Sequence, residues 1–147
     1  ICHVIHYNHV SPYQSTKFLF GKVTKYVADL CHKRVSDKLE VGYLGDARTY
    51  LHAEDAMNAA IKIMEVPYPA TYTVSNNEFI YARYLVETAF KIRGCNWKDH
   101  VIENKDLKRV GPTMDDMLFD DRTTRALGWS PSWKLEEILD EAIEYHV

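Results

Sequence analysis

Glycine-rich turns are missing from this sequence. Its six glycines nowhere form the Gly-x-x-Gly-x-x-Gly or Walker pattern that cradles a nucleotide phosphate. No Gly-x-Ser-x-Gly elbow presents a nucleophilic serine either. The 147 residues therefore contain groups that can bind a ligand, but no pattern in them predicts a reaction.

Cysteine is also scarce, and its spacing is unpatterned. Cys2, Cys31 and Cys95 are an odd number of widely separated thiols, which argues against a disulfide framework and against a zinc site. Such usage fits a reducing cytoplasm, where we expect the protein to be located. No apolar run approaches the ~20 residues that span a bilayer, and no signal peptide is recognisable, so we expect no membrane partner.

Charge of one sign does not dominate. Lys and Arg total 18 against 21 Asp and Glu, and the formal net charge of -3 provides no basic field for nucleic acid. We therefore expect no nucleic-acid partner, and any anionic ligand must be held by a few placed cations. A hydrophobic fraction of 46% is enough to build a globular core.

The order of periodic segments predicts an α/β fold. Alternating or β-rich segments predict strands, and apolar residues three and four apart predict helices. The third helix is predicted to begin at a capping box formed by Ser75 and Glu78. Strands that alternate with helices indicate a mixed α/β layer. The expected strands are 1–7, 39–44, 71–74 and 101–102, and the expected helices are 16–34, 52–64, 75–92 and 135–145.

The chain begins at Ile1, without Met, inside the first predicted strand. We therefore expect a fragment of a longer protein, in which residues 1–147 form a single region. An apolar strand at 1–7 with an uncovered edge would invite pairing with a second copy, which predicts a homo-oligomer.

The first candidate site is Asn8-His9-Val10-Ser11-Pro12. It leaves the end of a strand, which is where open α/β sheets bind ligands, and the Asn8 amide can donate to a phosphate oxygen. The alternative is an Asx turn that only shapes the loop. The spacing alone favours neither interpretation.

Arg48 is the second candidate. Its guanidinium stands just ahead of the second predicted helix, so its donors and the helix dipole would act together on a diphosphate. The alternative is an ion pair with Asp46 or Asp55. Two other cations are weaker candidates, because Lys22 is typical of a solvated helix face and Arg109 lies in an irregular charged segment.

Two apparent motifs are interpreted as coincidental. Tyr13 and Lys17 have the Tyr-x-x-x-Lys spacing of a dehydrogenase acid–base pair, but that chemistry needs both residues inside one ordered helix, and Tyr13 follows Pro12 directly. The acidic run at 115–121 lacks the glycine and the alternating oxygen ligands of a calcium loop. We therefore expect no catalytic pair here and no metal site.

Four segments together carry a family resemblance. The sequence reads Tyr-Asn-His-Val-Ser-Pro at 7–12, Lys-Phe-Leu-Phe-Gly-Lys-Val-Thr at 17–24, Arg-Thr-Tyr-Leu-His-Ala-Glu-Asp at 48–55 and Leu-Gly-Trp-Ser-Pro at 127–131. These are similar to Phe-Asn-His-Glu-Ser-Pro, Thr-Phe-Val-Thr-Arg-Lys-Ile-Thr, Arg-Asp-Trp-Gly-His-Ala-x-Asp and Leu-Gly-Trp-x-Pro. The set resembles the extended short-chain dehydrogenase/reductase superfamily and, within it, the GDP-mannose 4,6-dehydratase family. The first segment is the most specific, and the last is shared with fucose synthases and epimerases.

The resemblance implies a fold and a reaction. The chain would be the C-terminal portion of an extended short-chain dehydrogenase, a late Rossmann strand plus a small substrate-binding α/β domain, with the N-terminal Rossmann half absent. The parent enzyme would use NADP to oxidise C4 of a hexose, eliminate water across C5 and C6, and return the hydride. The family's Rossmann glycines and its catalytic Thr, Glu, Tyr and Lys precede the strand at Ile1. The resemblance therefore assigns no catalytic residue to this chain and implies no turnover by it alone.

The resemblance also implies binding roles. Asn8 and Arg48 would hold the diphosphate of a nucleotide sugar, GDP-mannose in the first instance. Lys22 and the backbone of Phe18 and Leu19 would lie near the base. The implied substrate-binding residues are Asn8, Phe18, Leu19, Lys22, Arg48 and Arg109, and the implied residues at the nicotinamide end of the cofactor are His9 and Ser11.

Departures from the family pattern leave the substrate open. The family's Arg-Pro-Thr-Glu-Val appears as Gly-Pro-Thr-Met-Asp at 111–115, without the Arg and the Glu that contact substrate, and Tyr43 replaces an Asn. One alternative is another nucleotide-sugar epimerase or synthase, such as a GDP-fucose synthase or an enzyme of UDP- or dTDP-sugars. The other is a non-catalytic, truncated binding or assembly module.

Overall fold

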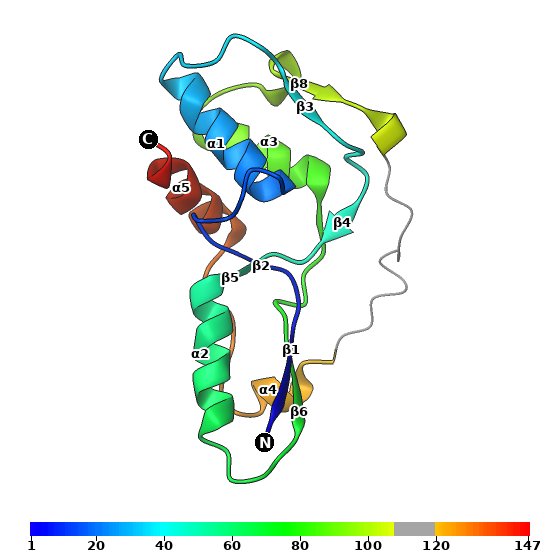
Figure 1. Ribbon diagram of the computed structural model, residues 1–147, viewed down its shortest axis with the longest axis vertical. Helices are drawn as coiled ribbons and strands as arrows, with labels where there is room; N and C mark the ends of the chain where they lie inside the picture. The colour runs from blue at the N-terminus through cyan, green and yellow to red at the C-terminus, as the bar shows by residue number, and fades with distance from the viewer. Residues whose placement is uncertain (108–119) are drawn as a thin grey trace.

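The structure is a computed structural model that describes residues 1–107 and 120–147. Figure 1 shows two lobes, one built mainly from helices and the other from strands with helices beside them. Each lobe has its own cluster of buried apolar side chains. The helical lobe contains α1 (Leu19–Cys31), α3 (Ala82–Ile92) and α5 (Leu135–Tyr145), and the strand lobe contains β1 (His3–His6), β6 (Thr71–Val74), α2 (Ala53–Met64) and α4 (Arg122–Arg125).

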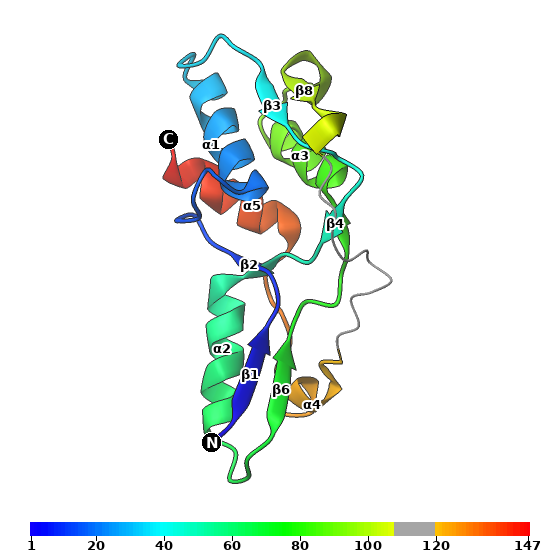
Figure 2. The ribbon, with the colours of Figure 1, turned by 45° about the vertical axis from the view of Figure 1, so that its right-hand side comes forward.

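In the strand lobe, β1 and β6 run parallel, with His3 opposite Thr71 and His6 opposite Val74. Alternation decides which side of β6 is covered, because Tyr72 and Val74 are buried and Thr71 is exposed. The buried side packs with apolar residues of α2 and with Trp129. The lobe is therefore a small sheet covered by α2 (Figure 2).

In the helical lobe, α1, α3 and α5 pack against one another through their apolar faces. A second parallel pair, β3 (Leu39–Val41) with β8 (Val101–Glu103), lies at the edge of these helices. The largest fully buried side chains include Phe20 of α1 and Phe90 of α3. Among the described residues, every helix is too short or too polar to cross a bilayer.

Two short strand pairs connect the lobes. β2 (His9–Val10) runs parallel to β5 (Leu51–His52), and β4 (Ala47–Arg48) runs antiparallel to β7 (Ile80–Tyr81). Single turns of 3-10 helix at 97–99 and 105–107 flank β8. The β2–β5 pair ties the end of β1 to the start of α2, and the β4–β7 pair holds the start of α3, so loops from both lobes meet at this junction (Figures 1 and 2).

The structure confirms the α/β arrangement predicted from the sequence. The strand expected at 71–74 and the helix expected at 135–145 have the predicted bounds. The first helix is shorter than predicted, because it begins at Leu19 and ends at Cys31. The basic residues from His32 to Arg34 therefore follow the helix, and Lys33 has the left-handed φ of 55° that terminates it.

The predicted start of the third helix is wrong. Residues 75–79 form a loop, Ile80 and Tyr81 form β7, and α3 begins only at Ala82. The Ser75 Oγ accepts a hydrogen bond from the Asn77 N–H instead of capping a helix, and the Asn76 side chain accepts one from the Glu78 N–H. These local side-chain bonds compete with helical bonds, and pairing with β4 then fixes the extended backbone.

Candidate functional site

A cavity of about 520 Å³ lies where the start of α1, the turn from β3 to β4 and the end of β1 meet. We call it the α1 cavity. Five of the six predicted substrate-binding residues line it, although they lie as many as 40 positions apart in the chain. These are Asn8, Phe18, Leu19, Lys22 and Arg48.

The N-terminus of α1 opens into this cavity. Phe18 is the N-cap residue, with extended φ and ψ of -98° and 150°, and its side chain makes no capping hydrogen bond. The first-turn N–H groups of an α-helix have no helical acceptor and carry a partial positive charge, so this end favours an anion. The sequence argument placed Arg48 at the start of α2. The structure corrects this, because Arg48 shares its cavity with the start of α1.

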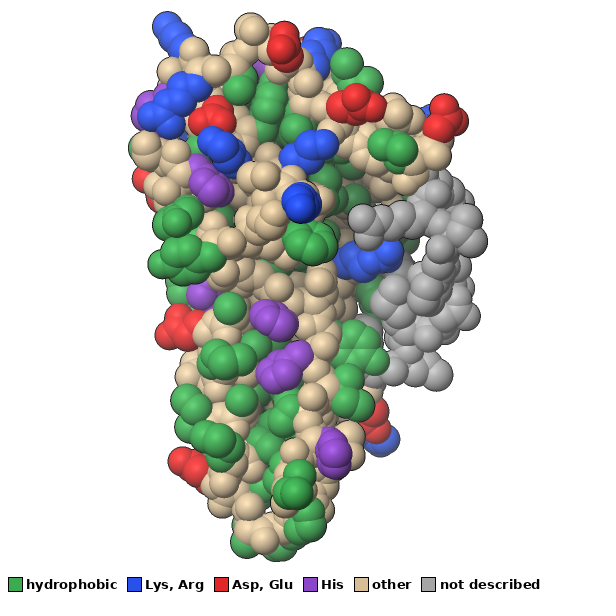
Figure 3. All heavy atoms as spheres, viewed as in Figure 1, with side chains coloured by type: hydrophobic (Ala, Val, Ile, Leu, Met, Phe, Trp, Pro, Cys, Tyr) green, Lys and Arg blue, Asp and Glu red, His purple; other side chains and the backbone are tan. Residues whose placement is uncertain are grey.

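The two candidate cations are not neutralised by neighbouring carboxylates. Arg48 donates to the Ala47 carbonyl oxygen at 2.7 Å, and Lys22 donates to the Glu40 carbonyl oxygen at 2.6 Å. Within residues 1–107 and 120–147, neither side chain forms an ion pair, so the expected alternative partners Asp46 and Asp55 do not engage Arg48. Figure 3 shows Lys and Arg side chains gathered over the lobe that contains α1.

Asn8 leaves the end of β1 with its side chain exposed. Its backbone carbonyl accepts a hydrogen bond from the Leu51 N–H at 3.2 Å, which fixes the strand end against β5. The side-chain amide forms no hydrogen bond within the described residues and lines the α1 cavity. The geometry therefore favours a ligand-facing Asn8 over an Asx turn.

Gln14 was missed in the sequence, and it also lines the α1 cavity. Its side-chain oxygen is buried and has no hydrogen-bond partner, a costly state for an amide unless a ligand or water supplies a donor. Gly21 makes its position possible. A Cβ at Gly21 would lie 2.4 Å from the Gln14 carbonyl oxygen and 2.8 Å from that of Ser15. The only sequence signal was that the family carries Arg where this chain has Gly21.

Tyr50 is the second residue that the sequence did not single out. Its ring is 6% exposed and stacks on Phe20, with ring centroids 6.4 Å apart. Its carbonyl accepts a hydrogen bond from the Asn76 side chain at 2.8 Å. Burial raises the pKa of Tyr50 to about 12, although the positive charge of Arg48 opposes this. Tyr50 is therefore a fixed, neutral phenol beside a cation.

Lys17 and Asp46 complete the charged lining of the α1 cavity. Lys17 belongs to the Tyr-x-x-x-Lys spacing that was interpreted as coincidental. Tyr13 and Lys17 both precede α1, and Tyr13 is 78% exposed and contacts the ring of Tyr145, with centroids 5.0 Å apart. The two side chains therefore do not form the helical acid–base pair.

The predicted cofactor residues lie beside the α1 cavity and do not line it. His9 is exposed, with Nδ1 3.2 Å from the Tyr7 carbonyl oxygen and its ring 5.7 Å from that of His6. Burial, and then the nearby His9, lower the pKa of His6. Nδ1 of His6 is buried without a partner. Ser11 Oγ accepts from the Tyr13 N–H at 3.3 Å, so its hydroxyl hydrogen remains available to a ligand.

Arg109 lies outside the described residues, as do Asp115 and Asp116 of the acidic run. At the end of that run, the aspartates pair with arginines. Asp121 is buried and accepts from Arg125 at 2.8 Å. Within the part of the chain that the structure describes, no group of three or more His, Cys, Asp or Glu side chains could hold a metal ion.

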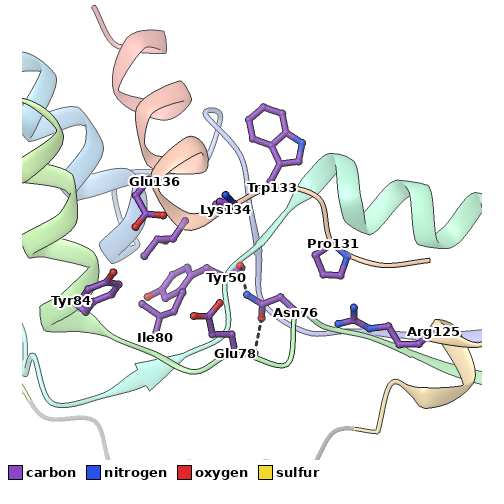
Figure 4. A pocket seen from close by; sticks show the side chains of 11 residues that line it. Tyr50, Asn76, Glu78, Ile80, Tyr84, Arg125, Pro131, Trp133, Lys134 and Glu136 are labelled. Carbon is purple, nitrogen blue, oxygen red and sulfur yellow. Dashed lines mark hydrogen bonds between the residues drawn. The ribbon is translucent and has the colours of Figure 1, made fainter. Parts of the chain in front are cut away.

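A second cavity, of about 410 Å³, lies between the two lobes, and we call it the junction cavity. Figure 4 shows Tyr84 and Glu136 at one end and Arg125 at the other, with Glu78 below. Arg125 is engaged by Asp121, and the Asn76 side chain bonds both Tyr50 and Glu78, so much of the polar lining already has partners within the protein.

Comparison with protein families gives a match over nearly the whole chain. The family model described as GDP-mannose 4,6 dehydratase matches residues 1–142. A GDP-mannose 4,6 dehydratase of Drosophila melanogaster is 28% identical over 160 residues, covering 97% of this chain and 40% of that protein. GDP-mannose 4,6 dehydratase 1 of Arabidopsis thaliana is 28% identical over 145 residues, covering 97% of this chain and 39% of that protein. The chain thus spans about two fifths of the length of these curated relatives.

Solved structures show the same fold. RMD from Pseudomonas aeruginosa, complexed with NADPH, superposes with a TM-score of 0.85 at 19% identity, over 97% of this chain and 47% of that one. UDP-glucuronic acid 4-epimerase from Bacillus cereus, in complex with UDP-glucuronic acid and NAD, gives a TM-score of 0.75 at 16% identity, over 99% and 45% of the two chains. The described residues therefore have part of the extended short-chain dehydrogenase fold.

Proposed function

The chain belongs to the GDP-mannose 4,6 dehydratase family, and from that premise we propose that it is the nucleotide-sugar-binding part of an NADP-dependent sugar-nucleotide dehydratase, with GDP-mannose as the substrate. Asn8, Arg48 and Arg109 hold the diphosphate. Lys22 and the Phe18–Leu19 backbone lie near the base. The family match and the curated relatives support the sugar-nucleotide role, and the α1 cavity supports the binding residues other than Arg109, which lies outside the described residues.

One observation carries the proposal. The α1 cavity combines a helix N-terminus without a side-chain cap, an unpaired guanidinium and an exposed amide. A helix N-terminus and an arginine are the groups that bind phosphates most often, because the dipole and the planar donors both favour an anion. Phe18 is 55% exposed at the rim, where a nucleobase can lie against its ring.

The role of this chain in the reaction is to bind and orient. NADP, when bound, supplies the hydride acceptor and donor for the oxidation at C4 and the later reduction. In this proposal His9 and Ser11 contact one end of that cofactor. Both follow β1, and the ring of His6, whose Nδ1 has no partner, lies 5.7 Å from that of His9. No catalytic residue is assigned among these 147 residues.

Isothermal titration of the purified chain with GDP, UDP and dTDP at low salt tests the proposal. We expect selective GDP binding, and Arg48→Ala should weaken it about tenfold or more, since a hydrogen bond to a charged group contributes about 1.5–3 kcal/mol. Tighter binding of UDP or dTDP would redirect the assignment to another nucleotide-sugar epimerase or synthase. If the chain binds none of the three nucleotides, the binding roles proposed for these residues are wrong.

The matched control is Arg122→Ala. It removes the same charge from a side chain that is 88% exposed and pairs with Asp120, outside the lining of the α1 cavity. It should leave GDP affinity unchanged. Equal losses in the Arg48 and Arg122 variants would indicate a general charge effect instead of a site.

A second candidate function, a non-catalytic assembly module, is favoured by the edge of β1. Within the described residues β1 pairs with β6 alone, and Ile1 and Ile5 are 101% and 50% exposed. A strand edge with exposed apolar neighbours can pair with a second copy. Sedimentation equilibrium should then show a homo-oligomer that Ile5→Lys dissociates. A monomer at all concentrations would remove this candidate.

The free thiols of all three cysteines support a reducing, cytoplasmic location under either function.

A further inference from the structure

Tyr50 is the residue that the two cavities share in the described part of the chain. It lies at the partition formed by β4 and β7, where Arg48 faces the α1 cavity and its register partner Ile80 faces the junction cavity. Asn76 holds the Tyr50 backbone, and Phe20 stacks on the ring. The phenol is therefore held in one position and is more than nine-tenths buried.

The Tyr50 hydroxyl has no hydrogen-bond partner among the described residues, although the surroundings suit a donor. The Tyr50 Oη is not among the fully buried side-chain atoms that lack a partner, so the hydroxyl remains accessible to a ligand from the cavities that Tyr50 lines. No carboxylate or carbonyl accepts a hydrogen bond from it within the described ranges. The positive charge of the Arg48 guanidinium acts on the phenol. A cation and a protonated donor at one place favour an oxyanion.

We propose that the Tyr50 hydroxyl donates a hydrogen bond to a phosphate oxygen of the bound nucleotide, and that Arg48 holds the same phosphate. This rests on the proposed nucleotide-binding function of the α1 cavity and adds a binding residue to it. The family signature Arg-Asp-Trp reads Arg48-Thr49-Tyr50 here, so the hydroxyl is a feature of this chain at a position where the family pattern has an indole.

The competing explanation is that Tyr50 only fills space between the lobes. Its stacking on Phe20 and its burial would then account for it fully. The two explanations differ in one atom. A Tyr50→Phe substitution keeps the ring, and with it the packing, and removes only the hydroxyl.

The test is isothermal titration of wild-type and Tyr50→Phe chains with GDP, pyrophosphate and guanosine. We expect Tyr50→Phe to weaken GDP and pyrophosphate about tenfold or more, as for a hydrogen bond to a charged group, and to leave guanosine unchanged. Tyr84→Phe is the control, because Tyr84 is 50% exposed and lines only the junction cavity among the described residues. It should change none of the three affinities.

The outcomes separate this inference from the function it rests on. If the Tyr50→Phe chain binds GDP with the same affinity as the wild-type chain, the hydroxyl contact is overturned and the nucleotide site is retained. Equal weakening of GDP and guanosine also overturns it, because the substitution then acts on the shape of the site. Absence of GDP binding by the wild-type chain overturns both.

A second measurement keeps the inference testable if Tyr50→Phe fails to fold. In the wild-type chain labelled with ¹³C at the tyrosine Cζ, the resonance assigned to Tyr50 should shift on addition of pyrophosphate and stay in place on addition of guanosine. The proposal is overturned if the Tyr50 resonance does not shift at a pyrophosphate concentration that saturates the binding site.

Discussion

The carboxylate of Asp55 accepts a hydrogen bond from the backbone N–H of Trp133 at 3.1 Å, across 78 positions of sequence. Asp55 also accepts from the N–H and the hydroxyl of Ser132, at 3.0 and 2.7 Å. The side chain is 2% exposed, in the first turn of α2. One carboxylate thus fixes the two residues that follow the Leu-Gly-Trp-Ser-Pro turn and sets the path into α5.

Asp55→Ala should therefore destabilise the protein strongly. It leaves two N–H groups and a hydroxyl without their acceptor at a partly buried position, and it removes a buried carboxylate that is fully hydrogen-bonded, so we expect a loss of about 2–4 kcal/mol in the free energy of unfolding. Urea denaturation followed by circular dichroism measures it. Glu87→Ala is the control, because Glu87 is exposed on α3 and forms no hydrogen bond or ion pair within the described residues. A loss no larger than that of the control would contradict the role given to Asp55.

Residues 75–81 adopt a structure that their local sequence pattern does not predict. Alternation at 71–74 and helical spacing at 135–145 were sufficient to predict those elements, because each buries one face against the core. Ser75 and Glu78 had the spacing of a helix cap, but pairing of β7 with the distant β4 decides that segment. A window of local sequence does not contain that contact.

The candidate site was also predictable only in part. Asn8 and Arg48 stand beside strand ends and carry groups suited to phosphate, so residue type and position were enough to single out two residues that line one cavity, while their contact with phosphate stays a prediction. Tyr50 could not be found this way, because a buried aromatic is typical of a core. Gln14 depends on the absence of a side chain at Gly21, a contact between backbone segments that residue types do not reveal.

Gly21→Ala should destabilise the chain although it replaces glycine inside a helix. At an open helical position the change would stabilise by about 1 kcal/mol. Here the new Cβ would lie 2.4 Å from the Gln14 carbonyl oxygen, so the loop before α1 must move, at a cost of about 1–3 kcal/mol. Thermal unfolding should show a lower Tm, and GDP titration a weaker affinity. Gly42→Ala is the control in the same cavity, since its nearest contact is 3.6 Å away. An unchanged or raised Tm for Gly21→Ala would refute the clash.

Arg93→Gln removes the charge and so tests the ion pairs between the end of α3 and α5. Arg93 contacts Asp140 at 2.7 Å and Glu144 at 2.5 Å, but both carboxylates are more than half exposed. Solvent screens such pairs, and we expect a loss below about 1 kcal/mol in the free energy of unfolding. The loss should shrink further in high salt, because salt screens exposed charges. Urea denaturation at low and high salt measures both. A loss that salt does not change would point to packing of the Arg93 side chain instead of its charge.

The raised pKa of Tyr50 predicts how stability falls in alkali. Burial raises the pKa of Tyr50 from 10.0 to about 12, so between these values the unfolded chain loses a proton that the folded chain keeps. The folded state is therefore stabilised fully below pH 10, and this contribution is lost as the pH rises from 10 towards 12. Over two pH units it amounts to about 2–3 kcal/mol. Urea denaturation of the wild-type chain from pH 9 to about pH 11.5 should show the decline.

Tyr50→Phe should remove that part of the alkaline decline, because phenylalanine has no proton to lose. Tyr84→Phe removes an exposed phenol and is the control. The Phe variant and the wild-type chain should therefore differ in slope above pH 10 and run parallel below it. If the two curves stay parallel throughout, the hydroxyl is not shielded from water, and the argument that it awaits an acceptor from the ligand fails with it.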